Sequence, residues 1–258
     1  MINILSNKIR QYIQELRQQS EVQKFSKRFP RVADFIFQRF QTRSFTGLPL
    51  TLLLLGCMIN LALLSRITED VVQSEGIVVV DKHFTAFLYD ARTGWLSKAL
   101  YIITQFGSRA STYIVGALVT AMALYRRSYA FILAFWLTMA VVGLSVQYTK
   151  KYISRDRPVD VGYYEEPNFS FPSGHATTAI AQYGIVAHLL LQVFRDRWKR
   201  RVVLWLMAVL IIAIGFSRIY LGVHFLSDVL AGFLLGGMWL LTGISLIEII
   251  SFKYRESS

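Results

Sequence analysis

The sequence Leu48-Pro-Leu-Thr-Leu-Leu-Leu-Leu55 lies within twenty-two consecutive uncharged residues between Arg43 and Arg66. An α-helix rises about 1.5 Å per residue, so about 20 apolar residues cross a hydrocarbon core about 30 Å thick. The stretch is therefore long enough to cross a membrane as a single helix. This one feature favours an integral membrane protein, in which further membrane-spanning segments are expected.

Five more predominantly apolar runs follow along the chain. They lie at residues 110–125, 128–149, 173–194, 202–217 and 223–250. The first of these is short, and residues 95–106 can extend it. We therefore predict an all-α fold in which residues 47–252 form an integral membrane bundle of six helices.

The composition agrees with this reading and excludes other classes. Hydrophobic residues make up 54% of the 258 residues and charged residues 17%, whereas soluble domains carry about 25% charged residues. A disordered chain needs low hydrophobicity and is excluded. The single cysteine, Cys57, excludes an intrachain disulfide and any multi-cysteine metal cluster.

The net charge of +12 follows the predicted loops rather than one soluble surface. The side that holds both termini carries 18 basic and 5 acidic residues, and the opposite side carries 10 of each. The positive-inside rule then places both termini in the cytoplasm and the opposite side outside the cell, or in the periplasm of a bacterium. We expect a plasma or inner membrane protein, and no nucleic-acid partner.

Residues 1–46 are predicted to form a basic, amphipathic, cytoplasmic segment. Apolar residues recur there at helical spacing, with Lys and Arg on the other faces: Ile2, Leu5, Ile9, Tyr12, Leu16, Val22, Phe25, Phe29, Val32, Ile36 and Phe40. Pro30 interrupts the pattern. The segment is either one or two helices on the inner leaflet or a solvated helical leader.

Residues compatible with phosphate chemistry lie at four predicted helix ends that share the outer face. Arg157 and Arg218 can each offer paired N–H donors to phosphate oxygens, and Lys150 adds a compact charge. Ser173 and Gly174 are expected to present backbone N–H groups at a helix N-terminus, with Pro172 in the first turn. These five positions predict an anion site.

His224 and Asp228 are four residues apart and share one face of a helix. Asp228 can accept a proton from one ring nitrogen of His224, which leaves the other nitrogen free to attack. His175, on a different helix, can protonate a leaving oxygen. A His–Asp pair at this spacing is also compatible with a purely structural hydrogen bond. Lys150, Lys151 and Arg155 are each also compatible with an anchor at the membrane interface.

The loop before Pro172 and the segment after the first span are less informative. Residues 159–171, which contain Tyr163, Tyr164 and Glu166, either select a headgroup or form an exposed interfacial loop. Residues 68–97 are too charged to cross a membrane and carry no recognisable chemistry, and within them residues 76–81 and 84–89 are expected along the outer interface.

The motifs resemble those of the type-2 phosphatidic acid phosphatase superfamily, which includes vanadium haloperoxidases. The family pattern is Lys-x6-Arg-Pro, Pro-Ser-Gly-His and Ser-Arg-x5-His-x3-Asp. Every specified position matches, at Lys150-x6-Arg157-Pro158, Pro172-Ser173-Gly174-His175 and Ser217-Arg218-x5-His224-x3-Asp228. The motifs cover residues 150–228, and the plan of six spans extends the likeness to about residues 45–252.

The resemblance implies a lipid phosphatase that needs neither metal nor cofactor. It implies phosphate binding by Lys150, Arg157, Ser173, Gly174 and Arg218, a His224 nucleophile oriented by Asp228, and a His175 acid. Expected substrates are phosphatidic acid, phosphatidylglycerol phosphate or a polyprenyl diphosphate.

Two alternatives remain open at this point. A lipid phosphotransferase would pass the same phosphohistidine to a second lipid, and a non-catalytic protein would bind or carry a lipid phosphate. The sequence does not predict an oligomeric state.

Overall fold

The computed structural model describes residues 11–41, 47–74 and 76–256. Regular secondary structure in these residues is entirely helical, and no strand occurs among them. The prediction of an all-α fold is confirmed. The chain divides into two compact units, one of Met1–Gly56 with Glu248–Ser258 and one of Cys57–Ile247.

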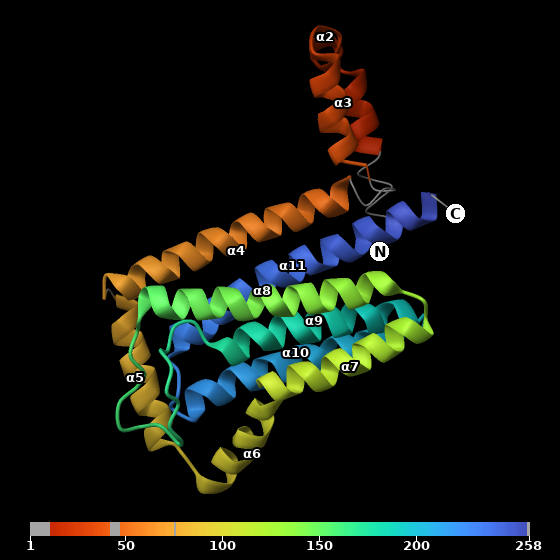
Figure 1. Cartoon of the computed structure of the whole chain (residues 1–258). Helices are drawn as coiled ribbons and strands as arrows, with labels where there is room; N and C mark the ends of the chain where they lie inside the picture. The colour runs from red at the N-terminus through yellow and green to blue at the C-terminus, as the bar shows by residue number, and fades with distance from the viewer. Residues whose placement is uncertain (1–10, 42–46, 75, 257–258) are drawn as a thin grey trace. The chain divides into compact units, whose positions relative to one another are not determined.

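Among the residues that the structure describes, five helices are long and apolar enough to cross a membrane. They are α4 (Leu48–Val72), α8 (Tyr129–Ile153), α9 (Gly174–Val193), α10 (Arg197–Tyr220) and α11 (Leu226–Glu256). The remaining predicted span corresponds to α7 (Arg109–Tyr125), which has 17 residues and packs beside α8 and α9 (Figure 1).

Residues 95–106 do not extend the predicted span at residues 110–125 as one straight helix. A 3₁₀ turn, η1 (Gln105–Gly107), separates α6 (Gly94–Thr104) from α7. Ser108 ends this turn and caps α7, because its hydroxyl oxygen accepts a hydrogen bond from the N–H of Ser111 at 3.2 Å. The change of direction therefore has a local cause in the sequence.

The segment expected along the outer interface forms one helix, α5 (Gly76–Asp90). Both α5 and α6 contact α10, and Figure 1 shows them at the end of the helices where the loop 154–173 emerges. These two short helices therefore lie at the end where the predicted site residues are found.

The N-terminal segment is helical where it is described. Helix α2 (Ser20–Arg28) is followed by α3 (Pro30–Arg39), and Pro30 occupies the first turn of α3. Residues 1–10 and 42–46 of the predicted segment, with Ile2, Leu5 and Ile9, lie outside the described residues.

Within the unit of residues 57–247, the core joins four helices. Phe131, Phe135 and Val142 of α8 pack with apolar residues of α7, α9 and α11. Other apolar side chains of the same helices remain exposed, including Leu133 and Leu144. A lipid environment accounts for such large exposed apolar surfaces, in accordance with an integral membrane protein.

Glycines bring α11 close to α9. A Cβ atom on Gly236 would lie 2.4 Å from the carbonyl oxygen of Thr177, and one on Gly232 would lie 2.7 Å from that of Ser173. Small residues four apart allow two helix backbones to approach in this way. The glycines of the last span therefore pack within the chain and place its N-terminal end beside Ser173.

We predict that Gly236→Ala destabilises the protein. Alanine is preferred to glycine in a helix by about 1 kcal/mol, but the added methyl group would overpack α9 at a cost of about 1–3 kcal/mol. Gly94→Ala is the matched control, since no atom lies within 4 Å of a Cβ at that position. A lower unfolding temperature in detergent for Gly236→Ala alone is expected, and equal temperatures for both variants would contradict the packing.

Candidate active site

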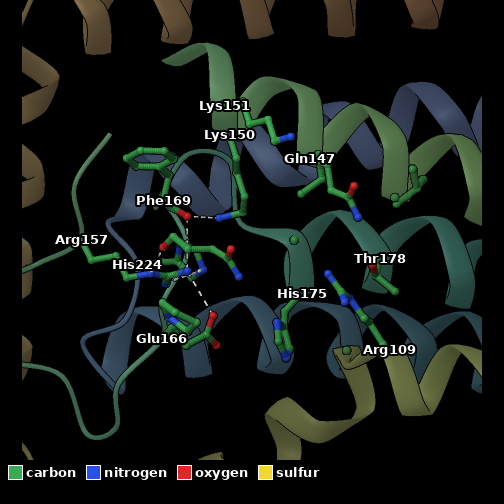
Figure 2. A pocket seen from close by; sticks show the side chains of 17 residues that line it. Arg109, Gln147, Lys150, Lys151, Arg157, Glu166, Phe169, His175, Thr178 and His224 are labelled. Carbon is green, nitrogen blue, oxygen red and sulfur yellow. Dashed lines mark hydrogen bonds and ion pairs between the residues drawn. The ribbon is translucent and has the colours of Figure 1, made fainter. Parts of the chain in front are cut away.

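A cavity of about 680 Å³ gathers five of the eight predicted site residues. Lys150 comes from the end of α8, Arg157 from the following loop, Gly174 and His175 from the start of α9, and His224 from the turn before α11. Figure 2 shows their side chains around one hollow. Segments separated by more than seventy residues therefore meet at one end of the helices.

The other three predicted residues do not line the cavity but lie behind the residues that line it. Arg218 and Asp228 are completely buried, and each reaches the cavity through a residue that lines it. Ser173 is buried as the N-cap of α9, where its hydroxyl oxygen faces the N–H of Ala176 at 3.5 Å.

The backbone around Ser173 corrects one expectation. The N–H of Ser173 was expected to face an anion, but it donates to the backbone carbonyl of Asp228 at 2.9 Å. Pro172 was expected in the first helical turn, but it precedes the cap because Ser173 takes the capping position. Gly174 begins the helix and lines the cavity.

The imidazole of His224 lies between a cation and a carboxylate. Its Nε2 is 3.2 Å from Nη1 of Arg157, and its Nδ1 is 3.4 Å from Oδ2 of Asp228. A guanidinium group only donates hydrogen bonds, so Nε2 must be the accepting nitrogen and Nδ1 carries the proton. The ring is thereby oriented with a lone pair on the side of Arg157.

The surroundings keep His224 neutral. Burial lowers its pKa well below the usual value, and the nearby charges of Arg218, Arg157 and Lys150 lower it further. A neutral imidazole is the form that can act as a nucleophile. His224 is therefore less protonated near neutral pH than an ordinary histidine.

Asp228 is held by several donors. Its Oδ2 accepts hydrogen bonds from the hydroxyl of Ser170 and from the N–H of Phe225, the latter at 2.8 Å. Its Oδ1 accepts from Nη1 of Arg155 at 2.7 Å. Buried carboxylates need such partners, and these contacts fix the oxygen that faces His224.

Arg155 also pairs with a second buried carboxylate. Its Nη2 donates to Oδ2 of Asp81 at 2.8 Å, and Asp81 also accepts from the backbone N–H of Ser227 at 2.9 Å. Arg155 therefore links α5 to the start of α11. The sequence interpretation assigned no chemistry to Asp81 and treated Arg155 as an interfacial anchor.

Glu166 connects the two predicted phosphate-binding arginines. Its Oε2 is 3.1 Å from Nη2 of Arg157, and its Oε1 accepts from Nη2 of Arg218. Lys150 donates to the backbone carbonyls of Phe169 and Ser170. A carboxylate and two loop carbonyls therefore contact the three cations.

Glu166 stays ionised in this position. Burial alone would raise its pKa, but the charge and hydrogen bond of Arg218, together with Arg157, lower the pKa to about 2. Tyr164 lies on the same loop and its hydroxyl accepts from Nη1 of Arg218. The loop of residues 159–171, whose role the sequence left open, thus contacts both arginines of the site.

Sequence reasoning missed Asp81, Glu166 and Ser170 for different reasons. Asp81 follows three consecutive valines, and a buried charge in an apolar stretch is a signal that could have been used. Glu166 and Ser170 lie in a loop, where spacing gives no information on direction. Within residues 11–41, 47–74 and 76–256, no three His, Cys, Asp or Glu side chains gather as metal ligands.

Comparisons with known proteins give one family. The PAP2 superfamily pattern matches residues 130–249. The chain is 30% identical over 182 residues to phosphatidylglycerophosphatase B of Bacillus subtilis, which covers 69% of this chain and 88% of that protein. It is 34% identical over 104 residues to the undecaprenyl-diphosphatase of Sulfolobus acidocaldarius, covering 37% of this chain and 46% of the relative.

A solved structure gives the same result. The crystal structure of the transmembrane PAP2 type phosphatidylglycerolphosphate phosphatase from Bacillus subtilis superposes with a TM-score of 0.63 at 29% identity. The match covers 78% of this chain and 96% of the solved chain.

We predict that Asp81→Asn lowers stability, because Arg155 loses one of its two carboxylates while remaining buried. Breaking a buried ion pair costs about 3–5 kcal/mol. Asp90→Asn is the matched control, since Asp90 is exposed on the same helix. Thermal unfolding of the two detergent-solubilised variants compares them, and a loss no larger for Asp81→Asn than for Asp90→Asn would refute the structural role of the pair.

Proposed function

This chain belongs to the PAP2 superfamily, and on that premise we propose that it is an integral-membrane lipid phosphatase acting through a phosphohistidine. Its relatives include membrane phosphatases named for lipid substrates. The finer steps below come from the geometry of the site.

One observation carries the proposal. The accepting nitrogen of His224 lies at the cavity, 3.2 Å from Arg157, while Asp228 holds the opposite side of the ring. A protein that only bound lipid phosphates would need the cations but not an oriented neutral imidazole facing them. The arrangement therefore favours catalysis over simple binding.

Phosphate binding replaces Glu166 between the arginines. Arg157 and Arg218 then donate to phosphate oxygens, with Lys150 adding charge and Gly174 adding the N–H at the start of α9. Among the described residues Nε of Arg218 has no acceptor, so one buried donor remains for the anion. Ser173 supports this wall by capping α9.

The first chemical step transfers the phosphoryl group to the protein. Nε2 of His224 attacks phosphorus in line, the phosphorus–oxygen bond to the lipid breaks, and His175 donates a proton to the departing oxygen. Asp228 stabilises the positive charge on the phosphorylated ring. Catalysis rests mainly on the positioned cations, which is typical of phosphoryl transfer.

The second step returns the protein to its starting state. Water attacks phosphorus, His175 takes the proton from that water, and the bond from phosphorus to Nε2 breaks. Inorganic phosphate leaves, and His224 is again neutral. No step uses a metal ion, so activity is expected to persist in a chelator.

The substrate is expected to be a lipid whose phosphate enters the cavity while its chains stay in the bilayer. The charge distribution of the loops supports both termini in the cytoplasm and the active site on the periplasmic or outer face. The plasma or inner membrane is the corresponding location.

The proposal predicts that His224→Ala lowers kcat for phosphate release by about a thousandfold or more, as expected for loss of a nucleophile. His83→Ala is the control, because His83 is exposed on α5 outside the cavity. Purified protein is assayed in a chelator with phosphatidic acid, phosphatidylglycerol phosphate and a polyprenyl diphosphate.

Three outcomes would contradict the account. Full turnover by His224→Ala would exclude the nucleophile, and activity lost in chelator would exclude the metal-free mechanism. Labelled phosphate appearing on a second lipid, rather than in solution, would establish a phosphotransferase instead.

A further inference from the structure

The cavity extends beyond the groups that act on the transferred phosphate. Its lining also includes Arg109, Gln147 and Thr178. In Figure 2 these three side chains lie on one side of His175, whereas Arg157 and His224 lie on the other. The cavity therefore has a second part, which the proposed mechanism leaves unused.

Within the described part of the chain, Arg109 and Lys151 line the cavity without the contacts that hold the other cations near the site. Arg155, Arg157 and Arg218 each contact a carboxylate, and Lys150 contacts backbone carbonyls. The Arg109 guanidinium has neither a carboxylate nor a hydrogen-bond acceptor in the described part of the chain, although it lines the cavity. Its charge is available to a ligand.

The position of Arg109 relative to His175 is fixed by close packing of the preceding turn. A Cβ atom on Gly107 would lie 3.1 Å from the carbonyl oxygen of His175 and 2.8 Å from a methyl carbon of Ile214. The carbonyl oxygen of Phe106 accepts from the hydroxyl of Ser111 at 2.7 Å. The backbone at Gly107, two residues before Arg109, is thus packed against His175 and Ile214.

In-line attack decides which part of a substrate meets Arg109. When His224 attacks from one side of phosphorus, the leaving group departs on the opposite side, where His175 protonates it. Whatever is attached beyond the leaving oxygen then extends past His175, toward the side on which Figure 2 places Arg109.

We propose that Arg109 binds a second phosphate group of the substrate and makes the protein selective for lipids that carry two phosphates. This inference rests on the proposed phosphatase function and assigns its substrate class. Two sources supply the same chemistry: a lipid diphosphate, in which the phosphates are adjacent, and a phosphatidylglycerol phosphate, in which a phosphodiester lies beyond the glycerol.

In the first step, Arg109 can stabilise the leaving group only when that leaving group carries a phosphate. In a diphosphate the bond between terminal phosphorus and bridging oxygen breaks, the terminal phosphorus bonds to His224, and the lipid monophosphate leaves with a proton from His175. The guanidinium stabilises the charge on that leaving phosphate by paired hydrogen bonds. With phosphatidic acid the bond between phosphorus and the glycerol oxygen breaks, and diacylglycerol leaves as a neutral alcohol that gains nothing from Arg109.

The test measures kcat/KM of the full chain in detergent for phosphatidic acid, phosphatidylglycerol phosphate and a polyprenyl diphosphate. Arg109→Gln is expected to lower kcat/KM by about tenfold or more for at least one lipid with two phosphates, as for loss of a hydrogen bond to a charged group. Its value for phosphatidic acid should stay unchanged, and Arg109→Lys should retain part of the lost activity.

Arg126→Gln is the matched control, because Arg126 is exposed at the opposite end of the same helix. Loss with only the diphosphate or only phosphatidylglycerol phosphate supports the proposal and identifies the source. The proposal would be overturned if Arg109→Gln lost kcat/KM equally with all three lipids or with none of them. It would also be overturned if the wild-type protein hydrolysed phosphatidic acid alone. If the wild-type protein hydrolyses none of the three, the proposed function fails and the selectivity with it.

Discussion

The contact between Arg155 and Asp228 is the interaction on which the site depends. Asp228 is completely buried in the first turn of α11, while Arg155 follows α8 and also reaches Asp81 of α5. Buried charges need partners, so this one guanidinium holds three segments together. The same carboxylate, Asp228, faces His224. The network that joins the segments therefore also sets the direction of the ring that is proposed to react.

Charge balance also explains the state of the site without substrate. Three motif cations line or adjoin one cavity, and their mutual repulsion is offset by Glu166 and by carbonyl groups of the loop 154–173. The same arginines that are proposed to bind phosphate already contact a carboxylate, which is also an anion. Under the proposed function, phosphate binding would exchange one anion for another, because Glu166 would have to leave both arginines.

The sequence could predict the helices and the meeting of their ends, because apolar length and the alternation of spans are local properties. The cavity indeed brings together Lys150, Arg157, Gly174, His175 and His224. The sequence could not predict that the N–H of Ser173 donates to the backbone carbonyl of Asp228, or that Glu166 contacts two arginines. Both interactions depend on tertiary contacts of the loop. The close packing of the turn before α7 against His175, which leaves no room for a side chain at Gly107, also depends on tertiary contacts that spacing does not reveal.

The most direct measurement is a structure of the full chain with orthovanadate, which mimics a phosphoryl group bonded to a nucleophile. The account predicts vanadium bonded to Nε2 of His224, with its oxygens on Arg157 and Arg218 and with Glu166 displaced from both. Vanadate bound away from His224, or a retained Glu166 bridge beside an unbonded Nε2, would contradict it.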